Sequence, residues 1–295
     1  MNITIVGAGA IGTLFGIKLA KSGHRVHFLT RHQENRIERC LNGLDLVEFV
    51  SNSADEVAHA DLVIVTTKAF QVCGALKPWL EHFPVKADIL LLHNGMGTAH
   101  KIESYTKAHR LFLGTTTHGA MRLTSSEFRH VGQGETRIGA FHPDIKEPEW
   151  LSSVHKAIPS TQWHSDIHQA LWLKLAVNCM INPLSAIHQC KNGQLLDDGF
   201  QDTWQQMSKE ISAVMVAEGV ETTPQEVLFI TRKVALATAE NYSSMNRDIH
   251  YHRQSENAFI TGYLLDRADY HGLDVPQNRA LWQQITELEQ GYENT

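Results

Sequence analysis

The stretch that decides the fold is NITIVGAGAIGTLFGIKLAKSGHRVHFLTR, residues 2–31. It opens with a β-branched apolar run and passes through a glycine turn into a helical pattern that Gly23 closes. A second apolar run follows. A strand, a helix and a strand in this order predict a β-α-β unit.

Gly7, Gly9 and Gly12 form a G-x-G-x-x-G pattern at the predicted strand-to-helix junction. In that setting the first glycine permits the tight turn, the second lets the backbone approach a pyrophosphate, and the third lets the helix pack on the strand. The helix N-terminus adds N–H donors and partial positive charge for the anion. We therefore predict a dinucleotide site, the alternative being a merely tight turn.

The residues after the second strand bear on which dinucleotide is bound. An NAD-binding chain often carries an acidic residue there, whereas this chain has Thr30 and Arg31. A guanidinium pairs with a 2′-phosphate and a hydroxyl can donate to it, so the sequence favours NADPH over NADH. The alternative is that Arg31 is an ordinary surface arginine.

Two further apolar runs end in polar residues, at Lys68 and at Asn94. Ligands of open α/β sheets bind at the carboxyl ends of the strands, so Lys68, Gln71 and Asn94 are candidate contacts for cofactor or substrate. For Gln71 the open alternative is a loop residue that caps a helix. Residues 127–140 read as two strands around a glycine turn that complete the sheet.

The second half of the chain is predicted to be helical. Asp166 can cap the first helix, so the boundary falls near Ser165, with a nucleotide-binding domain at 1–165 and a helical domain at 166–295. Strand-like alternation nearly disappears after residue 167, and the stretches 200–218 and 225–241 have helical spacing.

LWLKLAVNCMINPL, residues 171–184, places Lys174, Asn178 and Asn182 four residues apart, with Pro183 bending or ending the helix. The other faces are apolar, so this polar row faces a thin solvent edge or an enclosed cleft. Hydride delivery to a ketone leaves negative charge on oxygen, and a lysine can quench that charge. The alternative is that Lys174 extends its ammonium into water.

Composition limits the function classes. The chain has 295 residues, of which 42% are hydrophobic and 20% charged, as in an ordinary globular protein, with room for two domains. The net charge of −6 and the absence of a basic run argue against nucleic acid as a partner. The four scattered cysteines fit reduced thiols in the cytosol.

We expect a cytoplasmic protein with no membrane partner and no metal. The apolar run at 3–12 has no basic segment before it, and no uncharged apolar run approaches the ~18 to 20 residues of a membrane span. Among the 18 histidines, His164 and His168 have the spacing of a helical ligand pair, but no third ligand is apparent.

Several motifs together carry a family resemblance. They are GAGAIG, KAFQ, HNGMG, GTTTHGA, LWLKLAVNCMINPLSAI, KNGQL and AENYSSMNRDI followed by RQSE. In this order, from residue 1 to roughly 290, the chain resembles the ketopantoate reductases, which are NADPH-dependent 2-dehydropantoate 2-reductases. The resemblance implies a Rossmann-type domain, then an all-α domain of the 6-phosphogluconate-dehydrogenase type, with the substrate in the cleft between them.

The resemblance also implies roles for single residues. Lys174 matches the catalytic lysine, and Glu256 matches an acid that lies beside the lysine and the substrate hydroxyl and is also counted among the cofactor contacts. The matched substrate-binding residues are Asn94, Asn178, Asn182, Asn192 and Ser244. The matched NADP(H) contacts, in addition to Asn94 and Glu256, are Gly7, Ala8, Gly9, Ala10, Ile11, Gly12, Arg31, Lys68, Gln71 and Ala120. Gly119 stands where another small residue could, so the contact of Ala120 is assigned to its backbone.

The expected activity is reduction of 2-dehydropantoate to (R)-pantoate, on the route to pantothenate and coenzyme A, by a monomer or homodimer. Two alternatives stay open: a reductase of another branched 2-oxo acid, and a non-enzymatic sensor of NADP(H). From the residues alone, Ser244 could instead cap a helix, and Glu256 could pair with Arg253 on the surface.

Overall fold

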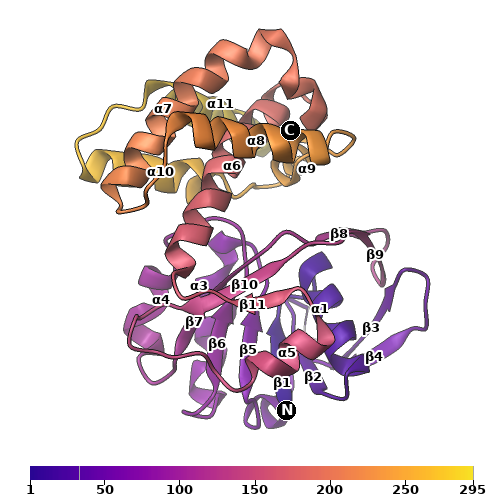
Figure 1. Ribbon diagram of the computed structural model, residues 1–295. Helices are drawn as coiled ribbons and strands as arrows, with labels where there is room; N and C mark the ends of the chain where they lie inside the picture. Colours follow the sequence, from indigo (N-terminus) through magenta and orange to yellow (C-terminus); the bar gives the residue numbers. More distant parts are fainter. Residues whose placement is uncertain (33, 295) are drawn as a thin grey trace. The chain divides into compact units, whose positions relative to one another are not determined.

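The computed structural model describes residues 1–32 and 34–294 (Figure 1). The chain divides into two compact units. The first consists of Met1–His93 and Thr98–Ala170, and the second of Asn94–Gly97 and the chain from Leu171 onward. The expected α/β first half and helical second half are confirmed. The domain boundary near Ser165 stays a prediction.

The first unit is built on a seven-stranded sheet with the order β11-β10-β7-β6-β5-β1-β2. Its strands are β1 (Asn2–Val6), β2 (Arg25–Leu29), β5 (Leu62–Val65), β6 (Asp88–Leu91), β7 (Leu111–Thr116), β10 (Thr136–Ala140) and β11 (Thr161–Trp163). Neighbouring strands are parallel, except that β10 runs antiparallel to β7. Parallel strands need crossover connections, and the first of these is the predicted helix after the glycine turn.

Helices cover both faces of this sheet, so its central strands are apolar on both sides. In β5, Leu62 and Ile64 pack with α1 and α5, whereas Val63 and Val65 pack with α2, α3 and α4. This alternation follows from the two-residue repeat of a strand. The helical segments are α1 (Ala10–Lys21), α2 (Ala54–Val57), η1 (Ala69–Gln71), α3 (Val72–Leu76), η2 (Lys77–His82), α4 (Thr98–Thr106) and α5 (Leu151–Ala157).

A second sheet of the first unit has the order β4-β3-β9-β8 and packs against α1. Its strands are β3 (Arg36–Leu41), β4 (Val47–Val50), β8 (Gly119–Arg122) and β9 (Glu127–Gly132). Ile37, Leu41 and Phe128 are buried in the same core as Leu14 and Phe15 of α1. The helix that follows the glycine turn is therefore enclosed between two sheets.

The prediction that residues 127–140 complete the large sheet holds for only one of their two strands. The segment does hold two strands, but β9 pairs with β8 in the small sheet and β10 pairs with β7 in the large one. The chain reverses earlier, where the Leu123 N–H donates to the Glu127 carbonyl at 2.8 Å. Gly134 lies in the connection between the two sheets, where a Cβ would overlap the backbone of Thr117. Its glycine is thus explained by a close backbone approach and not by a hairpin turn.

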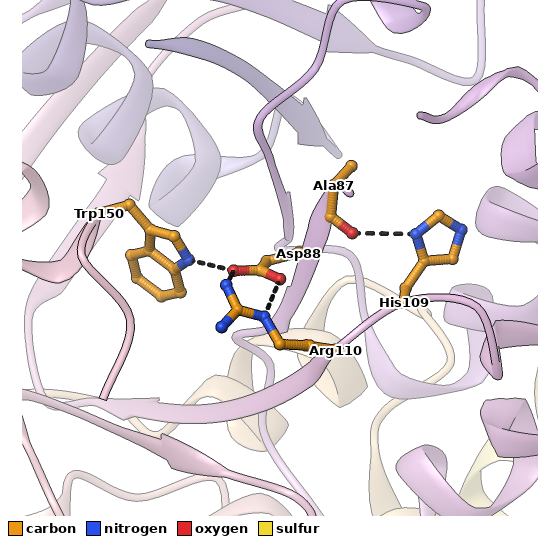
Figure 2. A network of polar contacts seen from close by, with 5 residues as sticks. All are labelled: Ala87, Asp88, His109, Arg110 and Trp150. Carbon is orange, nitrogen blue, oxygen red and sulfur yellow. Dashed lines mark hydrogen bonds and ion pairs between the residues drawn. The ribbon is translucent and has the colours of Figure 1, made fainter. Parts of the chain in front are cut away.

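A polar cluster fixes the edge of the large sheet where β6 begins, opposite the carboxyl ends of the parallel strands. Asp88, only 2% exposed, accepts hydrogen bonds from Arg110 Nε at 2.8 Å, Arg110 Nη2 at 2.6 Å and Trp150 Nε1 at 2.7 Å (Figure 2). The bonds to Asp88 raise the pKa of the Arg110 guanidinium. His109 lies beside this cluster and bonds through Nδ1 to the Ala87 carbonyl at 2.9 Å. Because ligands of such sheets bind at the opposite edge, we assign the cluster to stability.

The second unit is helical. Its segments are α6 (Ile167–Ile187, from Leu171 onward), η3 (Asn192–Leu196), η4 (Asp198–Phe200), α7 (Gln201–Ala217), α8 (Pro224–Ala237), α9 (Ser244–His250), η5 (Asn257–Phe259), α10 (Thr261–Tyr270), α11 (Pro276–Gln290) and η6 (Gly291–Asn294). Trp172 and Trp204 are fully buried in its core. Thr223 and Glu226 form a capping box at the start of α8, so that helix begins where the sequence pattern placed it.

Helix α6 differs from expectation at its end. The predicted cap is confirmed, since Asp166 Oδ1 accepts from the Gln169 N–H at 3.2 Å. Pro183 does not end the helix, which continues to Ile187. Ser185 Oγ lies 3.1 Å from the Asn182 carbonyl oxygen, a local contact that accompanies the proline. By length and composition α6 could cross a membrane, but 72% of its most apolar window is buried inside the protein, as in the core helix of a globular protein.

Candidate functional site

The glycine turn of the first unit has the geometry of an anion cradle. Gly7 has a φ of +102°, where L side chains are strained, and its N–H donates to the Leu29 carbonyl at 2.9 Å. A Cβ on Gly12 would overlap the Gly7 carbonyl oxygen and lie 2.5 Å from Thr66 Oγ1. Gly9 is exposed, and a Cβ there would meet no protein atom within 4 Å. Protein packing explains Gly7 and Gly12, whereas no protein contact requires a glycine at position 9.

Helix α1 follows this turn without a side-chain cap. Gly9 is its N-cap, and the first turn holds no acidic residue. The first N–H groups of the helix, on Ala10, Ile11 and Gly12, therefore point from a helix N-terminus toward the space left by Gly9. A phosphate is the group that such a terminus favours.

The structure places the other predicted cofactor residues at separate points of the first unit. Lys68 is the N-cap of η1 and Gln71 is its last residue, both directly after β5 and both half-buried. Gln71 makes no side-chain capping bond to α3, so the capping alternative does not describe it. Ala120 lies in β8 at an irregularity in the pairing with β9. Lys68 and Gln71 thus share the sheet edge of the glycine turn, whereas Ala120 belongs to the second sheet.

In the turn after β2, the two candidate residues Thr30 and Arg31 have different environments. Arg31 is exposed, and within the described residues no hydrogen bond or ion pair engages its guanidinium. The Thr30 hydroxyl donates to the His32 carbonyl at 2.7 Å and accepts from Asn52 Nδ2 at 3.0 Å. The expectation that Thr30 donates to a 2′-phosphate is not supported, because its only proton is used inside the turn.

In the second unit, α6 presents the predicted polar row. Lys174 and Asn178 are half-buried and Asn182 is 5% exposed. Trp172 and Cys179, on the other faces of α6, are fully buried. The row is therefore embedded in an apolar helix, as the spacing predicted.

Lys174 is electrostatically unusual. Burial lowers the pKa of Lys174 to about 8, and the negative charge of Glu256 opposes that shift. Lys174 itself is half-buried, so the alternative in which its ammonium reaches water stays a prediction beside the catalytic one. A lysine with a pKa near neutrality, beside a carboxylate, has the properties of a proton donor.

Glu256 is joined to a residue from the other half of the sequence. The Asn94 Nδ2 donates to Glu256 Oε2 at 3.2 Å. Glu256 is only 7% exposed, so it is not a surface partner of Arg253, whose guanidinium lies over the Tyr251 ring instead. The structure thus brings Asn94 and Glu256 together and places the Glu256 charge where it acts on Lys174.

Two glycines seat Asn94 in the second unit. Gly95 and Gly97 both have positive φ, +81° and +86°. A Cβ on Gly95 would lie 2.5 Å from the Phe259 carbonyl oxygen, and one on Gly97 would lie 2.9 Å from Tyr263 Cδ2. The Met96 N–H donates to the same Phe259 carbonyl at 2.8 Å. The HNGMG motif therefore contains Asn94 and also packs its backbone closely against Phe259 and Tyr263.

Ser244 is the first residue of α9 and is exposed. The neighbouring Ser243 caps the helix, because its hydroxyl accepts from the Asn246 N–H at 3.0 Å. The alternative role of Ser244 as a cap is wrong, and its hydroxyl is left outside the capping interaction. The sequence could not separate these two adjacent serines, since both have the capping residue type.

Three residues that sequence reasoning missed hold α9 against α6. The Ser185 hydroxyl donates to Ser243 Oγ at 2.7 Å, and Asn246 Nδ2 donates to the Ser185 carbonyl at 2.6 Å. Ser185 and Asn246 are fully buried and Ser243 nearly so. This network sets the distance between the end of α6, which carries Asn182, and the start of α9, which carries Ser244. The only sequence signal was a run of polar residues in AENYSSMNRDI.

Asn192 has a different environment from the other predicted asparagines. It begins η3, is 7% exposed, and donates from Nδ2 to Thr238 Oγ1 at 2.9 Å. Its N–H donates to the Asn241 carbonyl at 2.9 Å. These contacts tie η3 to the end of α8, which is a structural role.

No group of three His, Cys, Asp or Glu side chains that could hold a metal ion occurs in residues 1–32 and 34–294.

Comparison with known proteins decides the family. The model described as Ketopantoate reductase PanE/ApbA matches residues 3–143, and that described as Ketopantoate reductase PanE/ApbA C terminal matches residues 166–289. The chain belongs to the ketopantoate reductase family. The 2-dehydropantoate 2-reductase of Vibrio cholerae is 38% identical over 293 residues, covering 99% of each chain. The predicted family resemblance is confirmed.

Solved structures agree with this ketopantoate reductase fold. The PanE/ApbA family ketopantoate reductase of Ralstonia eutropha has a TM-score of 0.88 and 27% identity, covering 99% of this chain and 100% of its own. A D-mandelate dehydrogenase solved with NADH and anilino(oxo)acetate has a TM-score of 0.90 at 24% identity, with the same coverage. The second likeness concerns the fold alone.

Proposed function

We propose that this chain reduces 2-dehydropantoate to (R)-pantoate with NADPH, on the route to pantothenate and coenzyme A. Residues 1–165 would bind the dinucleotide and residues 166–295 the substrate. The proposal is supported by the family membership and by the curated relatives named 2-dehydropantoate 2-reductase. The structural observation that carries it is Lys174, half-buried in an otherwise apolar helix and under the influence of the buried Glu256 carboxylate.

The residues of the first unit fit a dinucleotide. The space beside Gly9 and the uncapped N-terminus of α1 suit a pyrophosphate, and Arg31 is available for a 2′-phosphate. Ala8, Ala10, Ile11, Lys68, Gln71 and Ala120 complete the proposed set of contacts. NADPH, when bound, supplies the hydride that reduces the carbonyl carbon of the substrate.

Lys174 deals with the charge that this reduction creates. As the carbonyl carbon is reduced, its oxygen becomes an alkoxide, and the Lys174 ammonium donates a proton to that oxygen. With a pKa of about 8, Lys174 is mostly protonated at neutral pH and is still a better acid than an ordinary lysine. Glu256 favours the protonated form, and the bond from Asn94 holds the Glu256 carboxylate in place.

The remaining polar residues of the second unit would position the substrate. Asn178 and Asn182 extend the row of Lys174 along α6, and Ser244 offers a hydroxyl that no capping bond uses. We assign to these residues the carboxylate and the distal hydroxyl of 2-dehydropantoate. Asn192, whose Nδ2 is engaged by Thr238, would contribute through its Oδ1, which has no partner among the described residues.

An absorbance assay of NADPH consumption over a panel of 2-oxo acids tests this assignment. The purified full chain should turn over 2-dehydropantoate much faster than branched 2-oxo acids that lack its distal hydroxyl, because a site built to bond a hydroxyl discriminates against its loss. Equal turnover would favour the alternative of a general branched 2-oxo acid reductase. Binding of NADPH without oxidation by any member of the panel would favour the NADP(H)-sensing alternative.

We further propose that the enzyme acts in the cytoplasm, as a monomer or a homodimer. The four cysteines are all free, which suits a reducing compartment. Phe229 and Leu236 lie seven positions apart on α8 and are 70% and 68% exposed, as expected for an apolar face that a second copy would cover. Light scattering coupled to size exclusion distinguishes the two oligomeric states.

A further inference from the structure

Asn52 organises the turn that carries Arg31. The Asn52 Oδ1 accepts from the Thr30 N–H at 2.9 Å. Its Nδ2 lies within hydrogen-bond distance of three acceptors: Thr30 Oγ1 at 3.0 Å, the His32 carbonyl at 2.7 Å and the Glu34 carbonyl at 3.0 Å. One amide side chain thus holds the backbone on both sides of Arg31.

The backbone of Asn52 is fixed by β2, which precedes the same turn. Its N–H donates to the Phe28 carbonyl at 2.9 Å, and the preceding Ser51 forms a parallel bridge with Phe28. Asn52 itself has a φ of +52°, in the left-handed region that asparagine tolerates better than most residues. Two constraints therefore favour asparagine at position 52. The backbone is left-handed, and the side chain must both accept and donate hydrogen bonds.

This arrangement leaves the cationic side chain of Arg31 available to a ligand. The Thr30 hydroxyl is occupied by His32 and Asn52, whereas the guanidinium of Arg31 is exposed and, among the described residues, unengaged. A flexible arginine gains most from a phosphate when the backbone beneath it is already ordered, because less conformational entropy is then lost on binding.

We propose that Asn52 is a positioning residue that preorganises Arg31 for the 2′-phosphate and thereby sets the preference for NADPH over NADH. This inference rests on the proposed function, since it concerns the same dinucleotide site. Asn52 acts through the turn and not by touching the cofactor. The fold alone does not dictate the preference, so a local device of this kind is needed to select between the two dinucleotides.

The test compares Asn52→Gly with a matched control, Asn42→Gly. Glycine keeps the left-handed backbone but removes the amide. Asn42 is also a left-handed asparagine of the first unit, with a φ of +60°, and its Oδ1 accepts from the His130 N–H at 2.8 Å, outside the turn that carries Arg31. The probes are 2′,5′-ADP and ADP, whose affinities for the full-length chain are measured by titration calorimetry, with thermal melting as the check on folding.

We expect Asn52→Gly to weaken 2′,5′-ADP about tenfold while changing ADP less than about twofold, the pattern of a lost charge-assisted contact to one phosphate. Asn42→Gly should leave the ratio of the two affinities unchanged. In an Arg31→Ala background Asn52→Gly should have no further effect on that ratio, because its action passes through Arg31.

Two results overturn the inference. One is an equal loss of affinity for both probes in Asn52→Gly, which would make the residue merely structural. The other is an unchanged ratio in a variant that melts like the parent. Failure of the proposed cofactor preference gives a different result, in which the unsubstituted chain binds 2′,5′-ADP no better than ADP.

Discussion

Asn94 donates a hydrogen bond to Glu256 across 162 positions of sequence, at 3.2 Å. The bond anchors a carboxylate that is almost completely buried and whose charge raises the pKa of Lys174 against the effect of burial. Two residues that the sequence places in different halves therefore control one protonation equilibrium. The consequences of that equilibrium can be measured.

The first prediction concerns the pH dependence of reduction. In the proposed mechanism the protonated form of Lys174 is the active one, so kcat/KM for the 2-oxo acid should be level below pH 8 and fall above about pH 8. Glu256→Gln keeps an acceptor for Asn94 but removes the charge that raises the pKa of Lys174. In this variant, kcat/KM should begin to fall at a lower pH than in the parent enzyme. A fall that begins at the same pH would disprove the coupling of the two groups.

The second prediction concerns catalysis by Lys174. Lys174→Ala should lower kcat by roughly 10² to 10⁴, the usual contribution of a general acid, and leave the Kd of NADPH almost unchanged. Single-turnover kinetics and fluorescence titration measure the two quantities separately. Unchanged oxidation of NADPH with 2-dehydropantoate in this variant would exclude the catalytic role.

The third prediction concerns the stability cost of Lys174. Its pKa is about 8 in the folded chain and near 10.5 when unfolded, so the unfolded chain binds more protons between these values and stability rises with pH across that window. Below pH 8 the buried charge lowers the free energy of unfolding by its full amount, which the difference between the two pKa values puts at about 3 kcal/mol. Lys174→Met should therefore raise the free energy of unfolding at pH 7, and the gain should shrink toward pH 10.5. Denaturant melts at several pH values test this, and a loss of stability at pH 7 would contradict it.

The fourth prediction separates two glycines of one motif. Gly12→Ala should destabilise the first unit, because the added Cβ overlaps the Gly7 carbonyl oxygen. Gly9→Ala should fold normally, since its Cβ meets no protein atom, yet weaken dinucleotide binding by occupying the space meant for the pyrophosphate. Thermal melting and NADPH titration of both variants give the comparison. Full binding by Gly9→Ala would show that the space serves no ligand.

The fifth prediction concerns the cluster of Figure 2. Asp88→Ala removes the acceptor of two Arg110 bonds and leaves the Trp150 indole N–H without its partner. The free energy of unfolding should fall by about 2 to 4 kcal/mol, in the range found for breaking a buried polar network. Because the cluster lies at the sheet edge away from the glycine turn, KM and kcat measured well below the melting temperature should not change. Altered kinetics in the folded variant would assign the cluster a functional role.

The sequence predicted those features that local backbone constraints determine. The glycine pattern identified β1 and α1, Asp166 identified the start of α6, and the four-residue spacing identified the row of Lys174. The fold class followed from these elements.

Features that depend on distant partners could not be read in the same way. Residues 127–140 read as two strands that complete one sheet, although the two strands join different sheets. Adjacent serines at 243 and 244 have equal capping propensity, and in the structure Ser243 is the one that caps α9 and contacts the hydroxyl of Ser185. The roles of Asn52 and of the bond between Asn94 and Glu256 depend on residues many positions away. Glu256 was identified through the family resemblance alone.

The four residues Asn94–Gly97 belong to the helical unit although the sequence around them belongs to the other. A chimera of two related reductases spliced between Ala170 and Leu171 would therefore inherit Asn94 from one parent and Glu256 from the other. Recombination at that seam separates the two partners of this bond, so viable hybrids should be those whose parents agree on both the tetrapeptide and the residues around Phe259 that contact it.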